Sequence, residues 1–386
     1  MGEIVPEILA SHTQGGKTLP EIQFRLLHGG GKRARNSGRL LQGVQNLARD
    51  LVWTFARVAK PCLRFGLDFC TGCKTFPEIQ GRLLQGGKRF LALAKEIFGY
   101  SEDFNYLCSM ITFPIAKINL GLNVVEKRPD GYHNLETVFY PVRIKDALEV
   151  FEMAPDFPSP VDCDLKVTNI RIEGDEHKNL VVRAYNLLKQ DFPTLPRVHA
   201  HLYKGIPTQA GMGGGSSDCG YMITLLTKML RLGLSEQQMI DYAARLGADC
   251  AFFISSRPTY AEGIGEKLQP IDLDLSGWYI AIVRPAIPVP TKEAFSLIHP
   301  HHPAKNCRDI VMQPVETWRG ELVNDFEQSV FSLHPEIGAI KDRLYEMGAA
   351  YAAMSGSGSS LFGLFHQPVT FDAFDAEGTF KTCLPL

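Results

Sequence analysis

The sequence lacks any apolar run long enough to cross a membrane, and it has no apolar signal core at its start. A membrane-spanning helix needs roughly 20 consecutive apolar residues, whereas apolar stretches such as 251–254 and 361–365 are far shorter. The acidic residues Glu3 and Glu7 precede the first lysine at position 17, and a secretory signal begins with positive charge instead. We therefore expect a cytoplasmic protein with no membrane partner.

Cysteine is also sparse, and no metal-binding pattern emerges from it. Nine cysteines in 386 residues, mostly isolated, are too few for a disulfide framework and are typical of reduced, buried thiols. Cys70 and Cys73 have C-x-x-C spacing but no second pair or nearby histidine, which makes a poor zinc site. His299, His301 and His302 stand among prolines, and we interpret them as an exposed loop. We expect no protein-built metal site.

Net charge is nearly absent overall, but its distribution is uneven. The chain has a formal charge of −2, yet residues 1–109 carry 15 Lys and Arg against 9 Asp and Glu, so the rest carries the negative excess. A basic arm of this kind could bind nucleic acid or an anionic surface. Its few aromatic residues and its interspersed acids argue against that role. We expect no nucleic-acid partner.

The first 109 residues contain an irregular duplication. The segment 17–30 (KTLPEIQFRLLHGG) recurs as 74–87 (KTFPEIQGRLLQGG), and 38–43 is a partial third copy. The copies are unevenly spaced and end in Gly-Gly, unlike the units of a stacked repeat. One amphipathic helix is predicted over 44–60. We interpret 1–109 as an extension that is poorly ordered or not native, with Met110 as the natural start.

From Met110 onward the patterning is that of a folded α+β protein. Strands are predicted at 111–125, 135–144, 198–203 and 279–283, with a turn at 127–131 between the first two. Helices are predicted at 180–189, 217–230, 235–246 and 336–347, the third of them opened by a capping box of Ser235 and Gln238. A strand and loop over 349–360 and a strand through 365 complete the recognisable elements.

A glycine-rich segment between a predicted strand and helix carries the strongest functional signal. It reads PTQAGMGGGSS over residues 207–217. Consecutive glycines let backbone N–H groups surround an anion, and the following helix adds the positive end of its dipole. A flexible loop is the alternative interpretation, but the strand-to-helix context and the terminal Ser-Ser favour a polyphosphate site. No Walker A motif is present, because Gly16-Lys17-Thr18 has Ser11 where that motif begins with glycine.

Phosphoryl transfer also needs a cation and a group that orients the attacking hydroxyl. Lys117 falls in an otherwise apolar strand, and Asp249 falls between a helix end and the apolar segment 251–254. Taken singly, Lys117 could extend from a sheet edge to solvent, and Asp249 could hydrogen-bond a turn. Neither residue is diagnostic alone.

Together and in this order, these features resemble the GHMP kinases, the superfamily of galactokinase, homoserine kinase, mevalonate kinase and phosphomevalonate kinase. The resemblance covers essentially all of 110–386 and none of 1–109. It is closest to the diphosphocytidyl-methylerythritol kinase branch. The segments that carry it, besides the glycine-rich one, are PIAKIN at 114–119, RPDGYH at 128–133, NL at 179–180, LGAD at 246–249, AEGIGE at 261–266, PTKEAF at 290–295, NDFE at 324–327 and MSGSGSS at 354–360.

The resemblance implies a set of site residues. Asp249 would accept the proton of the substrate hydroxyl, with Lys117 beside it stabilising negative charge. The implied ATP site consists of Pro207, Thr208, Gln209, Ala210, Gly211, Met212, Gly213, Gly214, Gly215, Ser216 and Ser217, with Asn179 and Lys204. Either Ser216 or Ser217 would orient Mg²⁺ or phosphate. The implied site for the second substrate consists of Asn119, Tyr132, His133, Phe295, Gly356 and Gly358.

The sequence departs from the family pattern at two places. Gln209-Ala210 stands where many relatives have further glycines, and Cys250-Ala251 follows Asp249 where Val-Pro is more usual. We interpret both as tolerated packing changes, although the second could displace Asp249 slightly.

The resemblance implies a two-domain fold. A ribosomal-protein-like ATP-binding domain would span 110–275 and a ferredoxin-like domain 276–386. The implied reaction is phosphorylation by ATP and Mg²⁺ of the 2-hydroxyl of 4-diphosphocytidyl-2-C-methyl-D-erythritol, by a monomer or weak homodimer. A homoserine or mevalonate-type kinase is the alternative.

Overall fold

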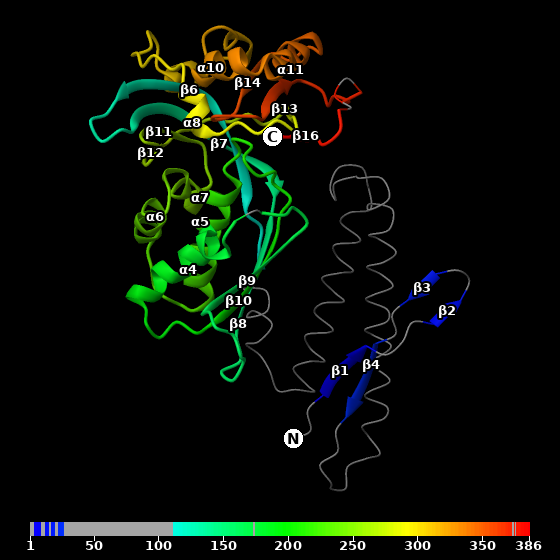
Figure 1. Ribbon diagram of the computed structural model, residues 1–386. Helices are drawn as coiled ribbons and strands as arrows, with labels where there is room; N and C mark the ends of the chain where they lie inside the picture. Colours follow the sequence, from blue (N-terminus) through cyan, green and yellow to red (C-terminus); the bar gives the residue numbers. More distant parts are fainter. Residues whose placement is uncertain are drawn as a thin grey trace. The chain divides into compact units, whose positions relative to one another are not determined.

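A computed structural model of the chain (Figure 1) describes residues 111–172, 174–372, 374 and 376–386, together with the backbone of four N-terminal strands. Those strands are β1 (Ile4–Ile8), β2 (His12–Gln14), β3 (Lys17–Leu19) and β4 (Ile22–Leu26), and β1 pairs with β4 and β2 with β3. They belong to one compact unit, Met1–Leu93, and the rest of the fold belongs to a second, Ala94–Leu386. Apart from these strands, the predictions about 1–109, including the 44–60 helix and the cysteine pair, lie outside the described residues.

The first sheet of the larger unit has helices packed on one face. In spatial order its strands are β5 (Ile111–Thr112), β8 (Ala147–Glu152), β10 (Val198–Tyr203) and β9 (Cys163–Thr168). β9 is parallel to β10, and the other pairs are antiparallel. Alternate residues, such as Leu148 and Val150, enter one core with α4 (Leu180–Asp191), α5 (Gly214–Met229) and α6 (Glu236–Ala244), as the period of two in a strand requires.

The second sheet is built on two long strands. Its order is β12 (Lys267–Pro270), β11 (Thr259–Gly263), β7 (His133–Lys145) and β6 (Ile115–Lys127), all antiparallel. The register of β6 shifts between Leu120 and Leu122. Gly121 between them has φ +69°, and a Cβ there would lie 2.6 Å from Leu322 Cδ1. Only glycine fits this irregularity without strain.

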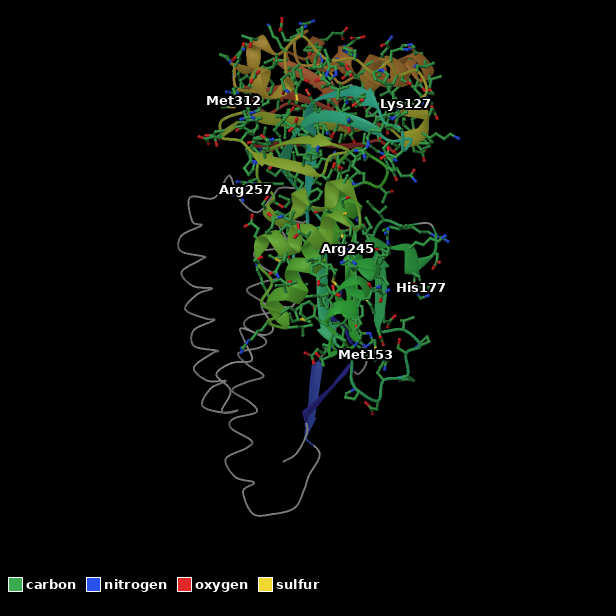
Figure 2. All side chains as sticks on the ribbon, turned by 90° about the vertical axis from the view of Figure 1, so that its left-hand side faces the viewer. Lys127, Met153, His177, Arg245, Arg257 and Met312 are labelled. Carbon is green, nitrogen blue, oxygen red and sulfur yellow. The ribbon has the colours of Figure 1, made fainter. Side chains whose placement is uncertain are left out.

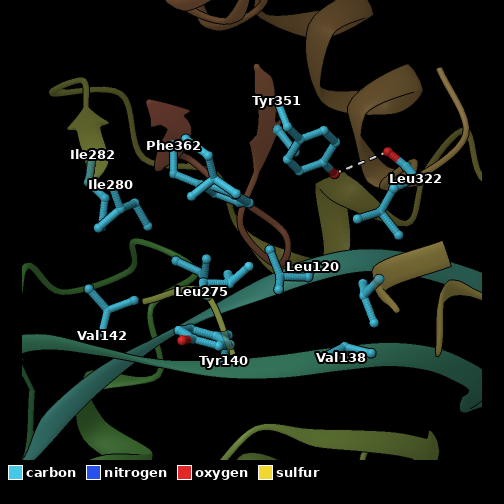
Figure 3. Close-up of a cluster of buried hydrophobic side chains, with 14 of the residues drawn as sticks. Leu120, Val138, Tyr140, Val142, Leu275, Ile280, Ile282, Leu322, Tyr351 and Phe362 are labelled. Atoms are coloured by element: carbon cyan, nitrogen blue, oxygen red, sulfur yellow. Dashed lines mark hydrogen bonds between the residues drawn. The ribbon is translucent and has the colours of Figure 1, made fainter. Parts of the chain in front are cut away.

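The third sheet is buried on both faces. Its order is β14 (Tyr351–Met354), β15 (Leu361–Phe365), β13 (Tyr279–Arg284) and β16 (Phe380–Pro385), all antiparallel. On β13, Ile280 and Ile282 pack towards the second sheet (Figure 3), whereas Ala281 and Val283 pack with α10 (Phe326–Leu333) and α11 (Pro335–Glu346). β13, β14 and β15 therefore read as nearly continuous apolar runs, whereas the edge strand β16 contains Lys381 and Thr382 and is mostly half-buried.

Short helical turns connect these layers. They are η1 (Glu176–Lys178), η2 (Ala248–Cys250), α7 (Phe252–Ser255), α8 (Thr291–Ala294), α9 (Cys307–Val311) and η3 (Val315–Thr317). Among the described residues, no helix is both long and apolar enough to cross a membrane.

The predicted elements from Met110 onward are largely confirmed. The strand at 198–203, the helix at 180–189 and the capping box of Ser235 and Gln238 are all present. The strand predicted as continuous over 111–125 is wrong in one respect, because it breaks before Pro114 into β5 and β6, which join different sheets. Proline has no N–H for a continuous ladder. The strands β8, β9, β11, β12 and β16 and the helix α10 were not predicted.

The two predicted domains share a core. In Figure 2, Met153 lies at the end of the described residues 111–386 that holds the first sheet, and Met312 lies in the part that holds the other two sheets. One buried cluster contains Leu120 and Val138 from before the predicted boundary at 275, and Phe362 from after it. The α+β class is confirmed, and the boundary itself stays a prediction.

Candidate active site

A cavity of about 700 Å³ brings most of the predicted site residues together. Its wall combines β6 and β7 with the segment before α5, η2, and the loop after β14. The predicted residues in the wall are Lys117, Asn119, Asn179, Lys204, every residue from Pro207 to Ser216, Asp249, Phe295, Gly356 and Gly358. Tyr132, His133 and Ser217 do not line it.

Lys117 and Asp249 form an ion pair in this wall. Lys117 Nζ lies 3.4 Å from Asp249 Oδ2 and 2.5 Å from Asn119 Oδ1. The same ammonium lies 5.1 Å from the centre of the Phe139 ring, a distance that permits a cation–π contact. The lysine side chain is 4% exposed and that of the aspartate 35%, so the carboxylate is the member of the pair that an entering ligand meets first.

Asp249 lies in the short helical turn η2, next to the buried Cys250. η2 begins after Gly247, and Cys250 N donates to Gly247 O at 3.1 Å. Cys250 and Ala251, the residues that depart from the family pattern, are both fully buried against α5 and its neighbours. With them in place, the carboxylate of Asp249 lies within ion-pair distance of Lys117.

The glycine-rich segment packs too closely for side chains at two positions. A Cβ on Gly211 would lie 1.9 Å from Ser355 O, and one on Gly213 would lie 2.9 Å from Phe253 Cζ. Both glycines have positive φ, as does Gln209 at +51°. Gly213 is the N-cap of α5 and offers no side-chain cap, and the part of the segment after it forms the first turn of that helix. The first N–H groups of α5 are therefore left for a ligand at the cavity.

Lys204 is buried between two carboxylates that the sequence analysis missed. Its Nζ hydrogen-bonds to Asp146 Oδ2 and, at 2.8 Å, to Asp218 Oδ2. Asp146 Oδ1 also accepts from the backbone N of Gly205 and Ile206. Burial raises the pKa of Asp218 well above its ordinary value, and the Lys204 ammonium opposes that rise. The charge of Lys204 is thus already engaged within the protein. An acidic residue directly after Ser216-Ser217, in an apolar helix, was the available signal.

The two serines at the start of α5 differ in their access to the cavity. Ser216 lines it. Ser217 is fully buried, and its hydroxyl has no hydrogen-bond partner among the described residues. Of the two, Ser216 is the better placed to contact a phosphate or its cation.

Aromatic rings hold Phe295 at the other side of the cavity. The Phe295 ring stacks on His133, with centroids 4.7 Å apart and planes at 22°, and meets Phe326 edge-on at 4.7 Å. Burial lowers the pKa of His133, which favours a neutral ring in this stack. Tyr132 is 62% exposed, and its side chain does not line the cavity. His133 therefore acts on the cavity through Phe295.

Asn119 and Gly356 lie next to each other in the cavity wall. Asn119 Nδ2 donates to Thr137 Oγ1 at 2.9 Å, which fixes its Oδ1 towards Lys117. A Cβ on Gly356 would lie 3.3 Å from that Oδ1. Thr137 is a further wall residue that the sequence analysis did not single out.

Two family models match the chain. The model described as GHMP kinases N terminal domain matches residues 179–257, and the one described as GHMP kinases C terminal matches 315–374. The matches include Asp249 and the glycine-rich segment in the first part and the Ser-Gly loop in the second. They confirm the two-part fold expected from the sequence.

Individual relatives are similar over most of this length. The chain is 53% identical over 266 residues to the 4-diphosphocytidyl-2-C-methyl-D-erythritol kinase of Bacteroides thetaiotaomicron, covering 69% of this chain and 96% of that protein. It is 51% identical to the enzyme of the same name from Bacteroides fragilis strain YCH46, covering 71% and 99%. A crystal structure of 4-(cytidine 5'-diphospho)-2C-methyl-D-erythritol kinase aligns with TM-score 0.58 and 31% identity, covering 72% and 99%.

Proposed function

Because this chain belongs to the 4-diphosphocytidyl-2-C-methyl-D-erythritol kinase family of GHMP kinases, we propose that it phosphorylates the 2-hydroxyl of that substrate with ATP, in the non-mevalonate route to isoprenoids. The observation that carries the proposal is the Lys117–Asp249 pair in the wall of one cavity with the glycine-rich segment. A proton acceptor, a cation and a phosphate cradle are what this transfer requires of a protein.

ATP would place its phosphates against residues 207–216. Backbone N–H groups at the start of α5 and the positive end of its dipole suit the phosphate oxygens. Asn179 and Leu180 line the same cavity and would contact the nucleoside. Because the ammonium of Lys204 is bonded to Asp146 and Asp218, we assign it to holding this wall rather than to binding a phosphate.

Mg²⁺ would arrive with the nucleotide. The described residues contain no cluster of three or more His, Cys, Asp or Glu that could hold a metal ion. An ion coordinated mainly by phosphate oxygens and water, as Mg²⁺ usually is in kinases, needs no such cluster. The hydroxyl of Ser216, which lines the cavity, would be available to it. When bound, the ion would neutralise charge on the transferring phosphate.

Asp249 and Lys117 would carry out the transfer. The carboxylate of Asp249 orients the 2-hydroxyl and accepts its proton as the hydroxyl oxygen bonds to the γ-phosphorus. The bond from that phosphorus to the β,γ-bridging oxygen breaks, and ADP leaves. The ammonium of Lys117, shielded from water, stabilises the negative charge that builds on the oxygens.

The cytidine end would lie against Phe295. A flat aromatic face suits stacking on the pyrimidine, and the His133 stack behind Phe295 keeps its ring in one orientation. Asn119 and the backbone of Gly356 and Gly358 would supply polar contacts nearby. Tyr132, being exposed, would contribute only if the bound substrate extends to it.

The experiment is an ADP-release assay of the full chain with ATP and three acceptors: 4-diphosphocytidyl-2-C-methyl-D-erythritol, homoserine and mevalonate. We expect turnover with the first acceptor alone and its loss in Asp249→Asn. Turnover confined to homoserine or mevalonate would keep the kinase class and overturn the acceptor. Turnover that persists in Asp249→Asn would overturn the role of that carboxylate.

A further inference from the structure

Three buried serines in the loop between β14 and β15 differ in what their hydroxyls do. Ser355, Ser359 and Ser360 are each at most 1% exposed. The hydroxyls of Ser359 and Ser360 have no hydrogen-bond partner among the described residues. The Ser355 hydroxyl donates to Gly211 O at 2.9 Å and accepts from Asn119 N at 3.3 Å. Only one of the three therefore connects the loop to other elements through its side chain.

The two partners of the Ser355 hydroxyl belong to the two halves of the reaction site. Gly211 lies in the glycine-rich segment that would hold the ATP phosphates. Asn119 lies on β6, and its side chain accepts from Lys117 Nζ. A backbone bond from Lys117 N to Met212 O, at 3.1 Å, joins the same segment and strand next to this point. The Ser355 hydroxyl thus lies where residues 207–216, the phosphate cradle, meet β6, the strand that carries Lys117.

Ser355 itself is fixed from behind. Asn324 Nδ2 donates to Met354 O at 2.7 Å and to Gly356 O at 2.9 Å, the carbonyls on either side of Ser355. Met354 N donates to Glu327 Oε1 at 2.7 Å. The Asn324 amide is oriented in turn by Phe326 N, which donates to its Oδ1. The loop is therefore held at this point mainly by Asn324 and Glu327, which do not line the cavity.

This loop packs closely against the phosphate cradle. The carbonyl of Ser355 leaves so little room at Gly211 that a Cβ there would lie 1.9 Å from the oxygen. This close backbone packing and the Ser355 hydroxyl, which is hydrogen-bonded on both sides, together restrict how the segment can move relative to β6. Displacing reacting groups by about 1 Å can lower a rate 10²-fold.

We propose that Ser355 is a positioning residue for phosphoryl transfer, whose hydroxyl sets the separation between the phosphate cradle and the Lys117–Asp249 pair. The inference rests on the proposed function, because it assigns the γ-phosphate to the cradle. Ser355 touches no reacting atom in this scheme. It acts through Gly211 and Asn119.

The test compares three substitutions in the full chain: Ser355→Ala, Ser359→Ala and Ser360→Ala. Each deletes one buried hydroxyl from the same loop, but only the first breaks hydrogen bonds. We expect kcat per folded enzyme to fall at least tenfold, towards the 10²-fold of a misplaced reactant, in Ser355→Ala alone. KM for ATP and for the acceptor should change less than threefold, since every wall residue remains. The two control variants should keep kcat within twofold.

A purely structural role would lower the melting temperature and leave kcat of the folded fraction unchanged, which would overturn the proposal. An equal fall of kcat in Ser355→Ala and Ser359→Ala would also overturn it. If Ser355→Ala does not fold, Ser355→Cys keeps the shape with a weaker hydrogen bond and should show the same fall. The comparison is made with whichever of the three acceptors the unaltered chain phosphorylates, so a wrong acceptor would overturn the proposed function without touching this result.

Discussion

Lys117 Nζ and Asp249 Oδ2 lie 3.4 Å apart, with the lysine sealed from solvent and the aspartate about one-third exposed. The sealed partner is an ammonium that donates to Asn119 Oδ1 and lies 5.1 Å from the centre of the Phe139 ring. The open partner is a carboxylate that faces the cavity. This asymmetry gives the two residues different consequences when each is replaced.

Asp249→Asn removes the proton acceptor while keeping the shape of the side chain. We expect kcat for the cytidine substrate to fall by about 10²- to 10⁴-fold, with KM changed only slightly, as measured by ADP release. Because the Asp249 side chain is partly exposed, the melting temperature of the variant should stay close to that of the unaltered chain. A variant with kcat within threefold would exclude Asp249 as the base.

Lys117→Met tests the sealed cation. The apolar side chain fits the surroundings of Phe139, so we expect the protein to fold. The loss of charge stabilisation at the transferring phosphate should lower kcat by about 10²- to 10³-fold. Stopped-flow measurement of a single turnover would locate the loss in the chemical step. A loss confined to ATP binding would contradict this assignment.

Gly211→Ala and Gly215→Ala separate a crowded position from an open one. A Cβ at position 211 would meet Ser355 O at 1.9 Å, whereas one at position 215 would meet nothing closer than Leu180 Cδ1 at 3.8 Å. We expect a lower melting temperature for Gly211→Ala, because the loop after β14 must move and φ there is positive. Gly215→Ala should melt no lower than the unaltered chain. Equal melting temperatures would show that the contact yields easily.

Asp218→Asn should change how stability depends on pH. Burial holds the pKa of Asp218 in the folded protein above its ordinary value of 3.8. Between those two pKa values the folded state binds more protons than the unfolded state, so this group makes stability fall as pH rises. The variant lacks that contribution, and its melting temperature relative to the unaltered chain should rise with pH above about 4. Parallel curves from pH 4.5 to 8 would contradict the shift.

Phe295→Leu should weaken binding of the cytidine substrate specifically. The substitution removes a ring that stacks on His133 and would stack on the base, and such aromatic pairs contribute about 0.5–1.5 kcal/mol each. We expect KM for that substrate to rise about tenfold while KM for ATP is unchanged. Phe371→Leu is a matched control, because the Phe371–Phe374 pair lies outside the cavity wall. A parallel rise in both variants would exclude a specific contact.

The sequence indicated which residues line the cavity better than it indicated how they are held. The glycine-rich segment and its helix follow from local rules about φ and N–H groups, although α5 begins at Gly214, three residues before the predicted start at 217. The Lys117–Asp249 ion pair forms because β6 and η2, which are distant in sequence, lie close together in the fold. Only the resemblance to GHMP kinases indicated this pair. Lys204 shows the limit most clearly, because the sequence contains no local sign that Asp146, from the end of another strand, neutralises it.

Strand assignments failed where the same pattern fits two structures. Residues 111–125 are mostly apolar, and Pro114, which lacks an N–H, is the only local sign of the break between β5 and β6. The partners of the Ser355 hydroxyl were equally hidden, since the four serines between positions 355 and 360 look alike in sequence. The Ser355 hydroxyl bonds to Gly211 and Asn119 and the Ser357 hydroxyl to Thr291, and all three partners come from distant parts of the chain.

The core that joins residues on both sides of position 275 has a practical consequence for dissecting the enzyme. A chain cut there would leave each fragment with an uncovered apolar sheet face, Leu120 and Val138 on one and Ile280 and Phe362 on the other. Such fragments should be insoluble apart and should regain kinase activity only when expressed together. The cut would make this protein a candidate for a split-enzyme reporter, in which two attached proteins that bind each other restore turnover.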